Sequence, residues 1–184
     1  MHRILQALPY FDRETEIEIR NAKVPVRAHQ IVVWVAIAPV GVDDPSTAVL
    51  RFPAILDTGH NHNFVITPQQ LKDWAGIEWQ SLPLEAGIEK KYNDIPVPHR
   101  RANIWLFPNR LGLRDEIDLT TTPVLFELDA GIAVYGNGVQ VGTQETSRLS
   151  GPRLPLIGLR ALTANRVNLV IDAKEMSVSL NLPV

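Results

Sequence analysis

An acid, a hydroxyl and a glycine end an apolar stretch of this chain, residues 52–56, as Asp57-Thr58-Gly59. We expect Gly59 to adopt a backbone conformation closed to other residues, so that the strand turns sharply after Asp57. The carboxylate would then lie at a strand end with backbone N–H groups near it, while the Thr58 hydroxyl bonds a neighbouring backbone group. The same three residue types are also common in ordinary turns.

Two histidines follow this stretch, at positions 60 and 62. Imidazole and carboxylate ligands suit zinc or iron, so Asp57, His60 and His62 form an alternative metal-binding set. In a strand, His60 and His62 would share one face, whereas the turn at Gly59 directs Asp57 elsewhere. The pattern therefore favours hydrogen-bonded histidines at the edge of a cleft, with substrate contact as their functional alternative, and predicts no metal site.

A second pattern lies about a hundred residues later. Leu156 and Ile157 come directly before Gly158, and the leucines at 159 and 162 then have the i, i+3 spacing of a short amphipathic helix. Either pattern alone is weak, because glycines after apolar residues are common. Together they form an early apolar-Asp-Thr-Gly and a late apolar-apolar-Gly.

The paired patterns resemble the retropepsin-like aspartic proteases, the single-lobe relatives of pepsin, over residues 29–182. The resemblance implies a mostly β, closed barrel or sandwich of a single lobe with one or two short helices. It implies that the loop of Asp57, Thr58 and Gly59 is catalytic, with Ile157 and Gly158 supporting it. It also implies a flap hairpin within residues 82–106, with residues 85–94 at its tip.

The mechanism implied by the resemblance needs two carboxylates that share a proton. At about 3 Å and an effective dielectric near 20, two ionised carboxylates would repel by roughly 5 kcal/mol, so only one would be charged. Within the chain, only Asp129-Ala130-Gly131 resembles a second copy, but it lacks the hydroxyl and a late glycine of its own. We interpret it as a hairpin turn within residues 123–136. The second carboxylate is therefore expected from Asp57 of another copy, in a homodimer.

The remaining patterns predict strands and one clear helix. Residues 29–57 have the composition of a hairpin, and residues 167–180 that of a final strand. The helix is expected at residues 67–76, with Thr67 as N-cap and Gly76 as its stop. We expect residues 1–28 to form an N-terminal extension or edge segment. Residues 29–184 would form the protease domain, with an insertion around 108–150 whose hairpin adds a sheet layer or a dimer contact.

Composition excludes several classes of function. The 184 residues include no cysteine, which excludes disulfides, thiolate metal sites and a thiol nucleophile. The net charge is −2, with basic residues scattered among acids, so we expect no nucleic-acid partner. The first 20 residues lack a signal-peptide core and no apolar run spans a membrane, so we expect a cytoplasmic protein without a membrane partner.

The sequence therefore predicts an aspartic endopeptidase, a hydrolase that acts on polypeptides as a homodimer and needs no cofactor. A non-catalytic binding or assembly module of the same fold is the second interpretation, since the histidine at position 60 departs from the small or apolar residue usual there. A metal-binding protein is the third.

Overall fold

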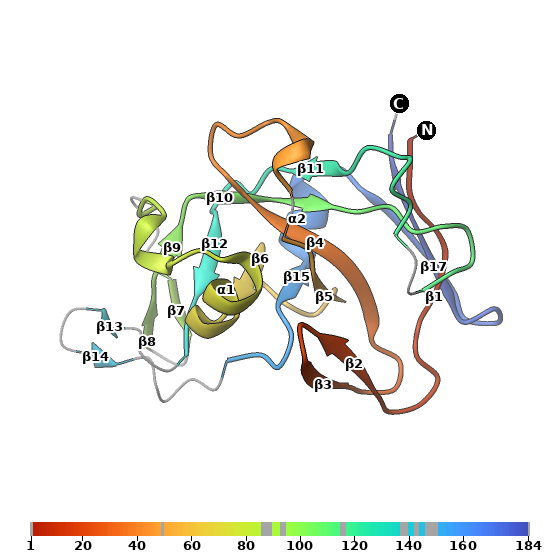
Figure 1. Ribbon diagram of the computed structural model, residues 1–184, viewed down its shortest axis with the longest axis horizontal. Coiled ribbons are helices and arrows are strands. Elements are labelled where there is room, and N and C mark those ends of the chain that lie inside the picture. Colours follow the sequence, from red (N-terminus) through yellow and green to blue (C-terminus); the bar gives the residue numbers. More distant parts are fainter. Residues whose placement is uncertain are drawn as a thin grey trace.

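A computed structural model describes residues 2–48, 50–85, 90–92, 95–114, 117–136, 140–141, 144–145 and 151–183 of the chain (Figure 1). Most of the regular structure is β. The strands are β1 (His2–Pro9), β2 (Thr15–Ile19), β3 (Ala22–Val26), β4 (Ile31–Pro39), β5 (Phe52–Asp57), β6 (Phe64–Ile66), β7 (Lys90–Tyr92), β8 (Ile95–Val97), β9 (His99–Arg100), β10 (Ala102–Leu106), β11 (Val124–Phe126), β12 (Ile132–Val134), β13 (Gln140–Val141), β14 (Gln144–Glu145), β15 (Leu156–Gly158), β16 (Asn168–Asp172) and β17 (Ser177–Leu182). The helices are α1 (Pro68–Ala75) and α2 (Leu159–Ala164), with single 3₁₀ turns η1 (Pro45–Thr47) and η2 (Trp79–Ser81).

Eight strands form the main sheet, in the order β11-β10-β4-β5-β15-β6-β12-β9. The sheet curls into a half-barrel (Figure 1). Among the described residues its two edge strands, β11 and β9, do not pair with each other, so the sheet is open. The expectation of a mostly β fold with one or two short helices is confirmed, whereas the expected closure of the barrel is wrong.

The centre of the sheet is the predicted hairpin of residues 29–57. β4 and β5 pair antiparallel, with Ile31 opposite Leu56 and Val35 opposite Phe52. β4 is buried along nearly its whole length, which explains its continuous apolar sequence. In the connection, the Asp44 carboxylate accepts the Ser46 N–H at 2.9 Å, as its turn composition predicts.

Helix α1 covers part of this sheet and follows its predicted boundaries. Thr67 caps the helix in a capping box with Gln70, and Gly76 ends it in the left-handed conformation, with φ of 69°. The apolar face of the helix is buried, and the ring of Trp74 lies 6.3 Å from that of Phe52 in β5. The two caps therefore set the ends of this helix, and its buried apolar face lies between them.

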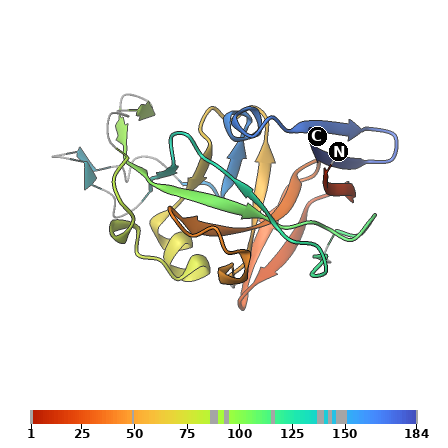
Figure 2. The same cartoon turned by 90° about the horizontal axis from the view of Figure 1, so that it is seen from above.

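The two ends of the chain meet in a separate three-stranded sheet, in the order β1-β17-β16 (Figure 2). Residues 167–180, expected to form one strand, instead form parts of the two strands β16 and β17, which pair antiparallel about a turn. Ile4 of β1 and Val26 of β3 belong to the same buried cluster as Phe52 of the main sheet. The first 28 residues thus share the core of the rest of the chain.

The expected hairpin at residues 123–136 does not form. β11 pairs with β10, whereas β12 pairs parallel with β6 and antiparallel with β9. Asp129 and Ala130 form the turn between these two strands, and Gly131 follows it with φ of 60°. The interpretation of this segment as a turn is confirmed. Its flanking strands join different parts of the main sheet, β11 at one edge and β12 next to the other edge strand, β9.

Candidate functional site

Asp57 is the last residue of β5, and its half-buried side chain lies where the buried strand ends. Its Oδ1 accepts the N–H of Gly59 at 2.9 Å, and its backbone carbonyl accepts the N–H of His60 at 3.1 Å. One bond to the Asp57 side chain and one to its backbone therefore close the loop after the strand. They fix the direction of the carboxylate without covering it.

The structure differs from the sequence-based expectations for Gly59 and Thr58. Gly59 does not have a positive φ, so it does not occupy a conformation closed to other residues. Its contribution is the N–H group that Asp57 accepts, and its lack of a side chain so close to that carboxylate. The Thr58 side chain is exposed, and its hydroxyl has no hydrogen-bond partner within the described part of the chain.

The late glycine lies beside this loop. β15 enters the sheet between β5 and β6, parallel to the first and antiparallel to the second. Gly158 is the partner of Asp57 in this pairing, and fully buried Ile157 is the partner of Leu56. The structure thus brings together the two patterns that lie about a hundred residues apart in the sequence.

Gly158 must be a glycine for a reason of space. Its N–H donates to the carbonyl of Asn63 at 2.9 Å. A Cβ at this position would overlap the carbonyl oxygens of His60 and His62, which are backbone atoms that cannot easily move. The absence of a side chain therefore allows the segment after Asp57 to pass directly against β15.

A network of an ion pair and hydrogen bonds also holds the segment that follows Asp57, through Asn63. Arg160, in the first turn of α2, binds both carboxylate oxygens of Asp129 at 2.7–3.2 Å. Asp129 Oδ1 also accepts the side-chain N–H of buried Asn63 at 2.8 Å. The sequence pattern gave Asp129 only a turn role. Its position after an apolar strand carried no signal that it joins α2 to the Asp57 loop.

Three histidine rings follow one another, and the first of them, His60, lies beside Asp57. The ring centroids of His60 and His62 lie 5.2 Å apart, and those of His62 and His99 lie 5.4 Å apart. Burial lowers the pKa of His60, and the charge of Asp57 opposes this shift. His99 Nδ1 lies 2.9 Å from the carbonyl oxygen of Ala130. The sequence pattern placed His99 only in a short basic cluster and missed this arrangement.

The alternative metal set of Asp57, His60 and His62 does not converge. Within the described ranges, no three His, Asp or Glu side chains are arranged to hold a metal ion. His60 Nε2 is buried and lacks a hydrogen-bond partner among these residues. His60 and His62 instead contact each other through their rings.

The predicted flap region contains a hairpin. β7 and β8 pair antiparallel, with Lys90 opposite Val97 and Tyr92 opposite Ile95. The predicted tip, residues 85–94, lies partly outside the described residues, at 86–89 and 93–94. The rest of the predicted region, β9 and β10, belongs to the main sheet.

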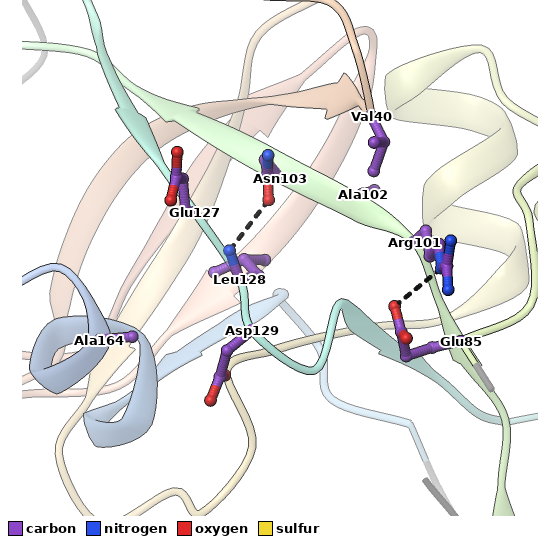
Figure 3. A pocket seen from close by; sticks show the side chains of 9 residues that line it. All are labelled: Val40, Glu85, Arg101, Ala102, Asn103, Glu127, Leu128, Asp129 and Ala164. Carbon is purple, nitrogen blue, oxygen red and sulfur yellow. Dashed lines mark hydrogen bonds and ion pairs between the residues drawn. The ribbon is translucent and has the colours of Figure 1, made fainter. Parts of the chain in front are cut away.

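A pocket of about 420 Å³ has Asp129 as one of its lining residues (Figure 3). Two of its acids are engaged in ion pairs, Glu85 with Arg101 at 3.2 Å and Asp129 with Arg160 at 2.7 Å. Its lining residues are Val40, Glu85, Arg101, Ala102, Asn103, Glu127, Leu128, Asp129 and Ala164. Asp57 and the histidines are not among them, so this pocket is separate from the loop.

None of the described helices is long and apolar enough to cross a membrane. Comparisons with known proteins add no relative: no protein-family model, no curated protein and no solved structure matches this chain.

Proposed function

We propose that this protein is an aspartic endopeptidase of the retropepsin-like class, in which Asp57 from each of two copies activates a water molecule. The observation that carries the proposal is the pairing of Asp57 with Gly158. It builds one compact site from the two patterns on which the resemblance depends. A chance turn of Asp, Thr and Gly would not require a distant glycine, placed against it without space for a side chain.

The chemistry requires two carboxylates with one proton between them. The charged one takes a proton from water, and the protonated one donates to the carbonyl oxygen of the scissile peptide. Each copy supplies one half-buried Asp57 whose carboxylate is held by the N–H of Gly59. Neither step needs a cofactor.

A second copy would cover apolar surface next to the loop. Leu159 is 50% exposed, and its N–H donates to the carbonyl of His60 at 3.2 Å, so it lies beside the Asp57 loop. Val170 and Ile171 of the edge strand β16 are 49% and 52% exposed. Figure 2 shows α2 and the β16–β17 hairpin on the same side of the molecule. A homodimer that unites two Asp57 loops would bury this surface.

The substrate of such a dimer would be an extended polypeptide. The β7–β8 hairpin offers strand edges to which a peptide can add through main-chain hydrogen bonds, and side-chain pockets would then select among peptides. The hairpin would cover the substrate above the carboxylates.

The proposal is tested by exposing an unbiased peptide library to the wild type and to Asp57→Asn at several protein concentrations. We expect cleavage by the wild type only, with activity rising as the square of concentration where the dimer dissociates. Unchanged cleavage by Asp57→Asn would end the proposal.

A non-catalytic binding module is the second candidate. His60 favours it, because a half-buried imidazole beside Asp57 is an unusual neighbour for a carboxylate that must share a proton. Such a module would capture peptides from the library without cleaving them, and Asp57→Asn would leave capture unchanged.

A further inference from the structure

Three of the five histidines of this chain form one column of rings. The interplanar angles are 42° between His60 and His62 and 41° between His62 and His99. His62 and His99 are only 7% and 2% exposed, while His60 is half-buried. The rings are tilted toward one another, not stacked in parallel, and at these distances neighbouring rings pack together as a column.

The column joins two functional parts of the proposed enzyme. At one end, the backbone N–H of His60 donates to the backbone carbonyl of Asp57, and the backbone carbonyl of His60 accepts the N–H of Leu159. At the other end, His99 begins β9, two residues after Val97, the last residue of the β7–β8 hairpin. Its carbonyl accepts the N–H of Glu85 at 2.9 Å, on the other flank of that hairpin. The rings therefore connect the carboxylate loop to the base of the hairpin.

Buried imidazoles packed against one another are more stable when neutral than when charged. Burial disfavours a charged ring, and a second proton would place like charges on neighbouring rings. Among the described residues, the charged groups near the column include Asp57 beside His60, the Asp129–Arg160 pair that bonds Asn63, directly after His62, and Arg100, next to His99 in β9. Asp57 favours a charged His60, but the burial of His60 outweighs it and lowers its pKa.

We propose that this column is a proton-sensitive joint that holds the Asp57 loop and the hairpin base together while its rings are neutral, and loosens when they take up protons in mildly acidic solution. Its effect on cleavage rests on the proposed function. The joint itself is a property of the fold and is measurable without any cleavage.

The direction of the pH effect follows from the lowered pKa. Below the ordinary value of 6.5, the unfolded chain binds a proton that the folded, partly buried His60 resists. This contribution to the stability of the folded protein is therefore fully present above about pH 6.5. It is lost as the pH falls toward the lower pKa of folded His60. The unfolding equilibrium constant rises by up to about tenfold per pH unit for each such proton.

The test is urea unfolding between pH 7.5 and 5 for the wild type, His62→Phe and His29→Asn. Phe keeps a flat ring but binds no proton, so we expect His62→Phe to lose part of this pH dependence. His29 lies outside the column, against Tyr10, and its φ of 63° suits Asn. We therefore expect His29→Asn to keep the pH dependence. An equal pH dependence in His62→Phe and the wild type would overturn the proposal.

A second measurement needs no variant. NMR titration of the wild type should show His60 taking up its proton below the ordinary pKa of 6.5, with faster exchange of the Glu85 amide proton, corrected for its intrinsic rate, once it does. Titration of His60 at the ordinary value, with no change in Glu85 exchange, would overturn the joint. Because neither experiment measures cleavage, an inactive protein with a coupled column would refute only the proposed function, and an active protein without coupling would refute only the joint.

Discussion

Gly158 is the partner of Asp57 in the parallel pairing of β15 with β5. The backbone path after Asp57 depends on the absence of a side chain at position 158. The loop after Asp57 runs back against β15 as closely as it does because position 158 carries no side chain. The N–H of Gly158 then bonds the carbonyl of Asn63 and holds that return in place.

This relationship predicts unequal effects of one substitution at two glycines. Gly158→Ala should lower the free energy of unfolding by about 3 kcal/mol, because the new methyl group meets backbone carbonyls. Gly59→Ala should cost less than about 1 kcal/mol, since its methyl group meets only the Asp57 carboxylate oxygen, at 3.3 Å. Urea unfolding of both variants measures the difference, and equal costs would contradict the packing described for Gly158.

The network of Asp129 predicts that the acid matters more than its ionic partner. Arg160→Ala removes an exposed ion pair and should cost less than about 1 kcal/mol. Asp129→Ala also leaves the amide N–H of Asn63, which is 1% exposed, without its acceptor, and should cost about 1–3 kcal/mol. Thermal or urea unfolding compares the two. A larger loss in Arg160→Ala would show that the ion pair dominates.

Local signals predicted those parts of the fold that local forces determine. Helix α1 has its caps, its proline and its apolar face within ten residues, and the β4–β5 hairpin is long and apolar. The contact between Asp57 and Gly158 was expected only because both patterns resemble one family.

Non-local contacts could not be predicted in this way. β11 and β12 are adjacent in sequence, yet each pairs elsewhere, because strand partners are chosen by burial in the whole sheet. The histidine column and the Asp129 network depend on residues from β9 and α2, whose positions follow only from the complete topology. The conformation of Gly59 was wrongly predicted because an Asx-type hydrogen bond closes this turn without a positive φ.

The exposed apolar edge predicts a site for disrupting the dimer. Ile171→Lys, on edge strand β16, should weaken self-association at least tenfold and reduce cleavage at low protein concentration, with recovery at high concentration. Leu119→Lys is the control, because Leu119 is 71% exposed but borders a different part of the surface. Sedimentation velocity and peptide cleavage measure both effects. Equal behaviour of the two variants would place the interface elsewhere.

A shared proton predicts how cleavage depends on pH. Activity should fall at low pH, where both carboxylates are protonated, and at high pH, where both are charged, which gives a bell-shaped profile of kcat/KM. Because the column loosens in acid, His62→Phe should keep its activity at lower pH than the wild type does. His29→Asn should leave the profile unchanged. A profile that rises to a plateau at high pH would indicate a single carboxylate acting alone.

The central claim is that two Asp57 carboxylates, one from each copy, form a single site. The most direct measurement mixes wild type with Asp57→Asn, exchanges the subunits and follows cleavage at constant total protein. If both copies contribute, only dimers of two wild-type copies are active, so an equal mixture should retain about one quarter of the wild-type activity. An equal mixture that retains about one half, as independent sites would, contradicts the account.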